Sequence, residues 1–205
     1  MPANALPVLH TVSVGALRPT QMTVGMREVK LKQKELQGMA AAKAGDFLGH
    51  HFMPAVIGPK GRYHIVDHHH LALALHRESI DQVLVTVLCD LSELDKDAFL
   101  TVLDNRAWLH PFDASGKRRP YRDLPKTVGD LADDPFRSLA GEVRRLGGYA
   151  KDTAPFAEFL WADHFRRRMD LRALEEDFGK AARQALKLAR RKSAGYLPGW
   201  SGPGD

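Results

Sequence analysis

The chain has 205 residues, 44% of them hydrophobic, and a net charge of +5 with histidine counted as neutral. This length and composition predict one folded domain, or one domain with a helical extension, and exclude a disordered chain. The single cysteine, Cys89, excludes an intrachain disulfide framework, and its apolar surroundings predict a buried, unreactive thiol. No signal peptide or membrane span is apparent, so we expect a cytoplasmic protein without membrane contact. The charge favours anionic partners and leaves nucleic-acid binding open.

The first elements are predicted from the spacing of apolar residues. Residues 8–16 are rich in β-branched types and predict a strand, and residues 17–21 predict a turn. Between residues 24 and 43, apolar residues recur at helical spacing among lysines such as Lys30. This pattern predicts an amphipathic helix with a basic outer face.

A hairpin and a helix are expected next. Residues 52–57 and 62–66 are short apolar runs, and the Gly-Pro-Lys-Gly of residues 58–61 between them supplies the dihedrals of a tight reversal. Residues 68–78 predict a helix, and residues 83–89 have the composition of a buried strand. The expected fold class is therefore α/β (α+β), a mixed sheet with helices packed against it.

The second half of the chain is predicted to be mainly helical. Ser92, three residues before an acidic residue, predicts a helix start, and this helix should reach about Arg106. Later helical patterns are interrupted by Pro135, by the glycine pair 147–148 and by Pro155. The apolar residues expected to face inward in the last run are Phe156, Phe159, Leu160, Phe165, Met169, Leu174, Phe178 and Leu186. The predicted organisation is a core domain (1–108), a loop (109–123), a helical region packed on the core (124–195) and a tail (196–205).

One stretch, residues 63–75, carries the most chemistry. A short apolar run ends at Asp67, and three histidines then open a segment of helical spacing. Asp67 suits the N-cap position, which would place His68, His69 and His70 in the first turn of the helix. Backbone N–H groups at a helix start attract anions, so we expect chemistry on a phosphate or a carboxylate.

The order of strand, turn, helix, hairpin and Asp-His-His-His helix start resembles the ParB/sulfiredoxin fold. Members of that fold carry an Asp-Gly-His-Arg or Asp-Gly-His-His-Arg motif at the head of a helix. The downstream segments at residues 123–128 and 133–141 look like the subgroup of ParB-like nucleases. Relatives bind cytidine triphosphate, repair sulfur groups with ATP or phosphorylate free serine.

The resemblance implies a phosphate site and assigns roles at matching positions. Asp67, His69 and His70 would be catalytic, whereas His68 replaces the usual glycine and so changes the closest backbone approach. Serine-kinase relatives have a glutamate base near Gln21, and glutamine cannot accept a proton, so Glu28 is the candidate substitute. The residues expected to bind the ligand are His68, Gln21, Thr20, Lys30, Arg118, Arg119, Arg137 and Ser138.

Three functions remain open on the sequence. The first is a small-molecule enzyme that binds ATP, ADP or another phosphorylated ligand with magnesium and catalyses phosphoryl transfer or hydrolysis. The second is a DNA-binding protein or nuclease, because Arg183, Lys187, Arg190 and Arg191 fall on one helix face, although nearby acidic residues interrupt this stripe and favour a solvated face. The third is a metal-dependent enzyme with His64 and His68 as ligands, although no established zinc spacing is present. The oligomeric state is open.

Overall fold

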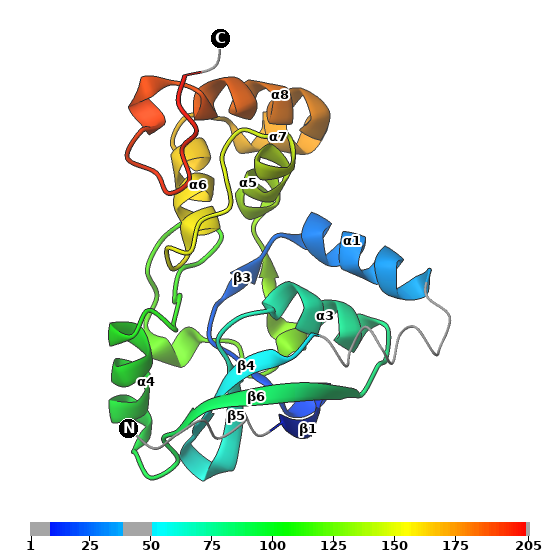
Figure 1. Ribbon diagram of the computed structural model, residues 1–205, viewed down its shortest axis with the longest axis vertical. Helices are drawn as coiled ribbons and strands as arrows, with labels where there is room; N and C mark the ends of the chain where they lie inside the picture. Colours follow the sequence, from blue (N-terminus) through cyan, green and yellow to red (C-terminus); the bar gives the residue numbers. More distant parts are fainter. Residues whose placement is uncertain (1–8, 39–50, 204–205) are drawn as a thin grey trace.

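The computed structural model describes residues 9–38 and 51–203 and confirms the expected mixed α/β class. A five-stranded sheet occupies one end of the molecule, and helices α5 to α8 gather at the other (Figure 1). We call described residues up to 131 the sheet half and residues 134–203 the helical half. The strands are β1 (Leu9–Ser13), β2 (Arg18–Pro19), β3 (Thr23–Val24), β4 (Met53–Gly58), β5 (Arg62–Ile65), β6 (Gln82–Asp90) and β7 (Ala132–Asp133). The helices are α1 (Met26–Gln37), α3 (His69–Arg77), α4 (Lys96–Asn105), α5 (Pro135–Arg145), α6 (Ala157–Arg166), α7 (Leu171–Glu176) and α8 (Phe178–Ala189).

The sheet has the strand order β1-β6-β4-β5-β2. The predicted hairpin is confirmed as the antiparallel pair β4 and β5, and its turn places Lys60 and Gly61 at positive φ. β6 lies parallel to β4 and antiparallel to β1. Residues expected as a turn instead form the short strand β2, which pairs with β5 in parallel. This pairing brings residues 18–21 beside the end of β5, where the histidine motif follows.

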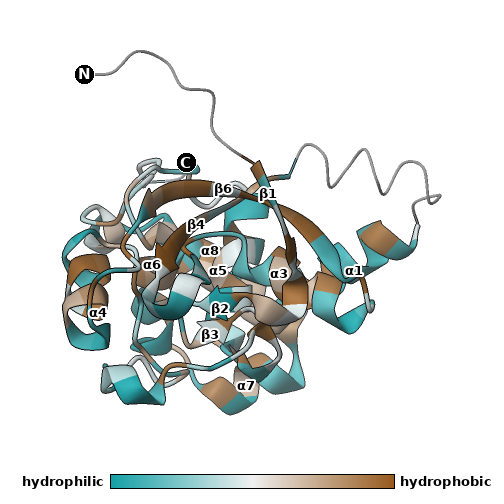
Figure 2. Cartoon of the chain, turned by 90° about the horizontal axis from the view of Figure 1, so that it is seen from below, coloured by the Kyte–Doolittle hydropathy of each residue, from teal (hydrophilic) through white to brown (hydrophobic). Residues whose placement is uncertain are grey.

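Helix α3 is the centre of the sheet half. Its apolar residues from Leu71 to Leu75 are buried, and α1 packs against it. Burying one Leu side chain of this kind contributes roughly 1.5–3 kcal/mol, so α3 fixes the motif at its N-terminus rigidly. The hydrophobic faces of β4 and β6 lie on the same core, and polar residues dominate the outer side of α1 (Figure 2).

The helical half has its own hydrophobic core. Trp161, Phe165 and Leu139 are completely buried in it, and Tyr149 stacks on Trp161 with ring centroids 4.2 Å apart. The spacing argument missed Trp161 and placed Leu160 inside, but Leu160 is 46% exposed. That expectation is wrong because the last run is three separate helices, α6 to α8, each with its own inner face.

Three helix starts or ends differ from the sequence predictions. α4 begins after Asp95, whose carboxylate accepts from the Asp97 and Ala98 amides, so the prediction of Ser92 as the start is wrong. α3 begins after His68, so Asp67 is not its N-cap. α1 ends at Gln37, and the remainder of the helix predicted to residue 43 lies outside the described residues.

Two further segments differ in their surroundings. Cys89, expected to be buried, is half-exposed, and Arg106 donates to its sulfur over 3.9 Å. In the segment expected as a tail, the Trp200 indole donates to the Ala189 carbonyl over 3.0 Å. In the described parts of the chain, no helix has the length and apolar character needed to cross a membrane.

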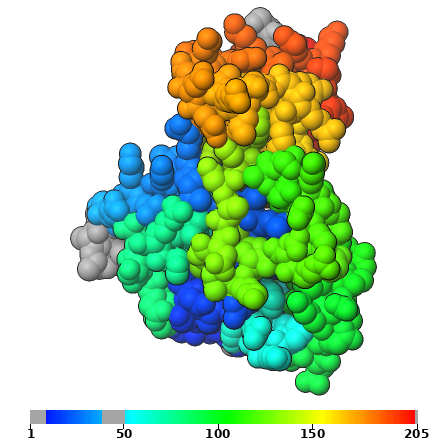
Figure 3. All heavy atoms as spheres, turned by 180° about the vertical axis from the view of Figure 1, so that it is seen from behind, coloured from blue at the N-terminus to red at the C-terminus, as the bar shows by residue number. Residues whose placement is uncertain are grey.

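The two halves are joined at a narrow waist (Figure 3). There β3 pairs in parallel with β7, and the Met26 amide donates to the Asp133 carboxylate over 2.8 Å. Gly25 lies so close to Ser138 that a Cβ atom at residue 25 would come within 2.8 Å of the Ser138 nitrogen. The waist therefore requires glycine at residue 25 and holds α1 against α5.

Candidate functional site

A cleft of about 450 Å³ opens between the two halves, and we call it the central cleft. The sheet half contributes the histidine motif and the end of the segment after β2, and the helical half contributes α5, the start of α6 and the loop between them. Five of the residues predicted as functional line it, namely Gln21, Asp67, His69, His70 and Arg137. Other lining residues discussed below are Ala107, Lys151, Asp152, Phe156, Glu158 and Phe159.

His69 is a buried connector in the wall of this cleft. Its Nε2 accepts a hydrogen bond from the Thr20 amide over 3.1 Å, and the Thr20 hydroxyl donates to the Ile65 carbonyl over 2.9 Å. Burial lowers the pKa of His69 to about 3, with Asp67 acting in the opposite direction. The ring is therefore neutral at physiological pH and ties residue 20 to the end of β5.

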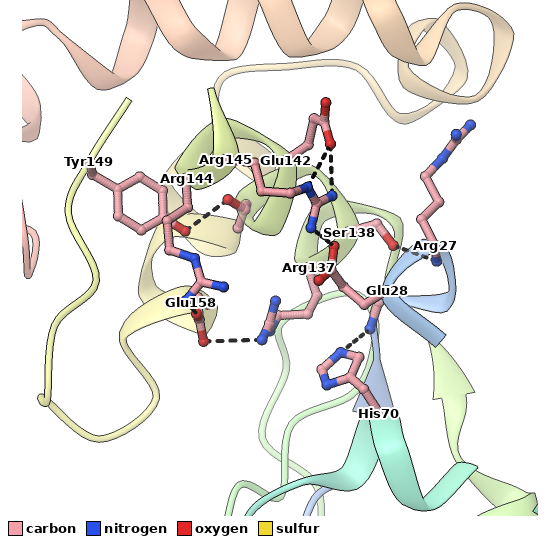
Figure 4. A network of polar contacts seen from close by, with 12 residues as sticks. Arg27, Glu28, His70, Arg137, Ser138, Glu142, Arg144, Arg145, Tyr149 and Glu158 are labelled. Carbon is pink, nitrogen blue, oxygen red and sulfur yellow. Dashed lines mark hydrogen bonds and ion pairs between the residues drawn. The ribbon is translucent and has the colours of Figure 1, made fainter. Parts of the chain in front are cut away.

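His70 is also held by a backbone donor. The Gly25 amide donates to its Nε2 over 3.0 Å (Figure 4). Burial, followed by the positive charge of Arg137, lowers the pKa of His70 well below its ordinary value. A neutral imidazole that accepts at Nε2 carries its proton on Nδ1. His70 is thus a hydrogen-bond donor in the cleft wall, and Nε2 is not free to act as a base.

His68 adopts the left-handed conformation, with φ at 64°. This is the residue that stands where the resembling motif has glycine, and left-handed backbone is disfavoured for a residue with a side chain. The Asp67 carboxylate accepts from the His68 amide over 2.6 Å, and Asp67 itself is exposed at the cleft. The turn therefore orients one oxygen of Asp67 and leaves its side chain accessible.

Other left-handed residues gather at the same place. Ala107 and Phe156, with φ of 53° and 58°, line the central cleft. Within the described ranges, the remaining non-glycine residues with positive φ are Lys60 and Ser79, away from the cleft. Backbone strain of this kind, about 1–3 kcal/mol per residue, clusters at functional sites.

Two helix starts at the cleft lack a side-chain cap, as does α1, which follows Gly25 at the waist. Aspartates cap α4, α5, α7 and α8, each carboxylate accepting from backbone amides of the first turn. α3 and α6 have no side-chain cap, and both follow a left-handed residue. The amides of His69, His70 and Leu71 donate to no acceptor among the described residues. Unpaired amides at a helix start form a favourable site for an anion.

An arginine and glutamate cluster forms the opposite wall. The Arg137 guanidinium donates to the Glu158 carboxylate over 3.1 Å, and Arg144 donates to the other oxygen over 2.6 Å (Figure 4). The Nε of Arg137 is buried without a hydrogen-bond partner, and its guanidinium lies 5.4 Å from the Phe159 ring centre. One carboxylate thus serves two arginines, and Arg137 retains donor capacity in the cleft.

Three residues assigned a role from the sequence lie outside the cleft lining. Glu28 pairs with Arg145 over 2.6 Å, with its side chain 18% exposed (Figure 4). Ser138 accepts from the Arg27 amide over 3.2 Å at the waist. Lys30 is exposed on α1. Glu28 and Ser138 therefore help to join α1 to α5.

Arg118, Arg119 and His64 also lie away from the central cleft. Arg118 pairs with Asp104, and Arg119 pairs with Asp123 over 3.3 Å. His64 packs on Phe99 with ring centroids 4.7 Å apart, and burial, then the neighbouring Arg18 and Arg62, lower its pKa to about 4. Within residues 9–38 and 51–203, no three His, Cys, Asp or Glu side chains come together as a metal site.

Several cleft residues were not found from the sequence. Glu158 and Lys151 lie in the helical half and approach the motif only after folding. Phe159 also lines the cleft, and it stacks on His110 behind it with ring centroids 3.9 Å apart. Only the position of Glu158 in the first turn of a helix, three residues after Pro155, could have indicated a residue near an anion site.

The comparisons with known proteins identify the family and a structural relative. A family model described as "putative ParB-like nuclease" matches residues 10–167, so the chain belongs to the ParB-like family, as the motif resemblance predicted. The protein Atu1540 from Agrobacterium tumefaciens, known from a crystal structure, is 48% identical to this chain. The two superpose with a TM-score of 0.92 over 98% of this chain and 100% of that one. A comparison of this sequence with curated proteins found no match.

Proposed function

We propose that the central cleft binds a phosphate-bearing small molecule, a nucleotide such as ATP or ADP with magnesium, and that the protein catalyses phosphoryl transfer or hydrolysis there. The observation that carries this proposal is the uncapped start of α3, whose free amides face a cleft that also holds Arg137. Helix starts and arginine forks are the two donors that proteins most often use for phosphate.

Each lining residue has a distinct role in this proposal. Amides of α3, the Arg137 guanidinium and the Nδ1–H of His70 hold the phosphoryl oxygens and stabilise the charge that develops on them. Magnesium bound with the phosphates needs only one or two protein carboxylates, and Asp152, which lines the cleft, would supply one. His69 is a positioning residue, because its ring nitrogen is already occupied by Thr20.

Asp67 is the residue we assign to proton acceptance, in place of Glu28. Glu158 is committed to two arginines, and Glu28 is paired with Arg145 outside the lining. Asp67 is exposed, and among the described residues one of its carboxylate oxygens has no donor. It can therefore accept the proton of an attacking hydroxyl or water as the phosphoryl group moves away.

Two arginines that share one partner provide a matched test of binding. Arg137 and Arg144 both pair with Glu158, but only Arg137 lines the cleft. In calorimetric titration with ATP and magnesium, Arg137→Gln should weaken binding in the cleft about tenfold, and Arg144→Gln should change it less than threefold. Equal effects would mean that Glu158 matters only for folding, and an absence of nucleotide binding by the wild type would overturn the proposal.

A variant of Asp67 tests the catalytic step. Asp67→Asn retains an oxygen that can accept from the His68 amide but cannot take up a proton at neutral pH. Release of phosphate from the nucleotide should fall about 100-fold or more, with nucleotide affinity nearly unchanged. A variant that retains turnover would remove Asp67 from the mechanism.

The second candidate is a DNA-binding or nuclease function, favoured by one surface. Arg183, Lys187, Arg190 and Arg191 are exposed on or next to α8 and form no ion pair with the described residues. α8 lies beyond the residues that match the family model. This reading predicts salt-sensitive DNA binding that Arg183→Gln with Lys187→Gln weakens and Arg137→Gln does not.

A further inference from the structure

A second hollow lies in the sheet half, separate from the central cleft. Its volume is about 400 Å³, and we call it the basic pocket. The hairpin β4–β5, the start of α4 and the segment around residue 122 surround it, and Figure 3 shows the hairpin in cyan beside the green part of the chain. Five cationic residues line it, namely Arg18, Arg62, Lys96, Arg122 and Lys126.

The charges of the basic pocket have almost no counterions. Among the residues that the structure describes, no aspartate or glutamate lines it. Arg62, Lys96 and Lys126 form no ion pair with a described residue, and Arg122 approaches Asp123 only at 3.8 Å. Like charges gathered from separate segments repel one another, and this cost is accepted where an anion is bound. The arrangement differs from an ordinary solvated surface, where opposite charges alternate.

Buried polar groups point to the same conclusion. The Nε of Arg18 is buried without a hydrogen-bond partner, while its Nη1 donates to the Lys126 carbonyl. His64, in the wall, is uncharged at neutral pH because burial and then Arg18 and Arg62 lower its pKa to about 4. An unpaired buried donor costs roughly 1–3 kcal/mol, and an anion bound beside this guanidinium would stabilise its charge.

The rest of the lining is apolar. Leu100, Leu109, Tyr121 and Leu124 form a hydrophobic side opposite the cations. A free phosphate ion would leave this side uncovered, whereas a molecule with an organic group attached to its phosphates would cover it. The lining therefore selects for an anion with an apolar or aromatic body.

We propose that the basic pocket is a second ligand site, which binds a phosphate-bearing organic molecule of the nucleotide class independently of the central cleft. The cations hold the phosphates, and the apolar side holds the base or another organic group. The ligand comes from solution as a free nucleotide or is presented as the end of a nucleic acid, because both offer the same phosphate chemistry. This site goes beyond the function proposed for the cleft.

The test uses protein in which the cleft is already impaired by Arg137→Gln. ADP and inorganic pyrophosphate are titrated calorimetrically into this protein, and ADP should bind more tightly because it also covers the apolar side. Adding Arg62→Gln and Lys96→Gln should weaken ADP binding about tenfold. Both residues are exposed, so folding should be retained, and thermal melting without ligand verifies this.

The matched control removes the same charges elsewhere. Arg183→Gln with Lys187→Gln also replaces one arginine and one lysine, on exposed positions of α8. An equal loss of ADP binding in this control would mean that only net charge matters and would overturn the proposal, as would a failure of ADP to bind the Arg137→Gln protein. A single-stranded oligonucleotide that carries a 5′-phosphate and displaces ADP would identify a nucleic-acid end as a source of the ligand.

Discussion

The central cleft and the basic pocket are both lined by residues of the segment 18–21, but they differ in whether their charged side chains have counterions. In the cleft, Arg137 is balanced by Glu158 and the histidines are neutral. In the basic pocket, five cations face one another without an acidic residue. The cleft is arranged by internal hydrogen bonds before any ligand arrives, whereas the basic pocket gains its electrostatic partner only from a ligand. Substitutions should therefore destabilise the first and not the second.

The largest effect is expected at His69. His69→Ala removes a buried ring and leaves the Thr20 amide without an acceptor. The free energy of unfolding should fall by about 2–4 kcal/mol, measured by urea denaturation. His68→Ala, at a half-buried neighbour with no such bond, should cost less than about 1 kcal/mol. Similar losses in both variants would contradict the assignment of His69 as a connector.

The next largest effect is expected from acid, which should lower the free energy of unfolding because several histidines are neutral in the folded protein. Burial lowers the pKa of His69 to about 3 and of His64, His110 and His164 to about 4. Between these values and 6.5 the unfolded chain binds protons that the folded chain does not, so this contribution to stability is present above pH 6.5 and lost as pH falls. Urea denaturation at pH 7 and pH 6 should differ by roughly 1–3 kcal/mol, because each of the four histidines contributes about 0.7 kcal/mol over this interval. A flat profile would mean that these rings charge in the folded state.

A smaller gain is expected at His68. Glycine adopts left-handed backbone without penalty, so His68→Gly should raise the free energy of unfolding by about 0.5–1 kcal/mol. His68→Ala serves as the comparison because it keeps the Cβ atom and therefore the strain. Thermal and urea denaturation of the two variants measure the difference, and a destabilised glycine variant would show that the imidazole makes a contact worth more than the strain.

The smallest effect should have the opposite sign from that at His69. Arg62→Gln with Lys96→Gln relieves repulsion in the basic pocket, and the ligand-free protein should gain a few tenths of a kcal/mol. The gain should shrink at high salt because screening already weakens the repulsion. A clear loss of stability would show that these cations have structural partners and would weaken the contrast between the two sites.

Local signals predicted the sheet half well. The hairpin at β4 and β5, helix α3 and strand β6 follow from turn residues and apolar spacing within a few residues, and α1 also begins close to its predicted start. Asp67 and His70 both line the central cleft, and one contiguous motif carries both. Predictions failed where a competing local signal exists. Asp95, and not Ser92, is the N-cap of α4. The left-handed His68, and not Asp67, occupies the N-cap position of α3.

Sites assembled from distant segments could not be predicted in the same way. Glu158 meets Arg137 only because α6 packs against α5. Glu28 is suitably acidic and near Gln21 in the chain, but the direction of α1 turns its carboxylate toward Arg145. The basic pocket collects its cations from positions 18 to 126, and no spacing rule connects them. Such groupings depend on how distant segments pack together, which single-sequence patterns do not encode.

The ribbon of β3 and β7 at the waist limits how this molecule can move. It crosses from one half to the other next to the cleft, and the Asp134 amide extends it by donating to the Val24 carbonyl over 2.8 Å. A hinge motion that separated the two halves would have to break the hydrogen bonds between β3 and β7 and move Gly25 away from Ser138. A ligand should therefore enter and leave the central cleft through a mouth of constant width, and rotation of side chains should control this access.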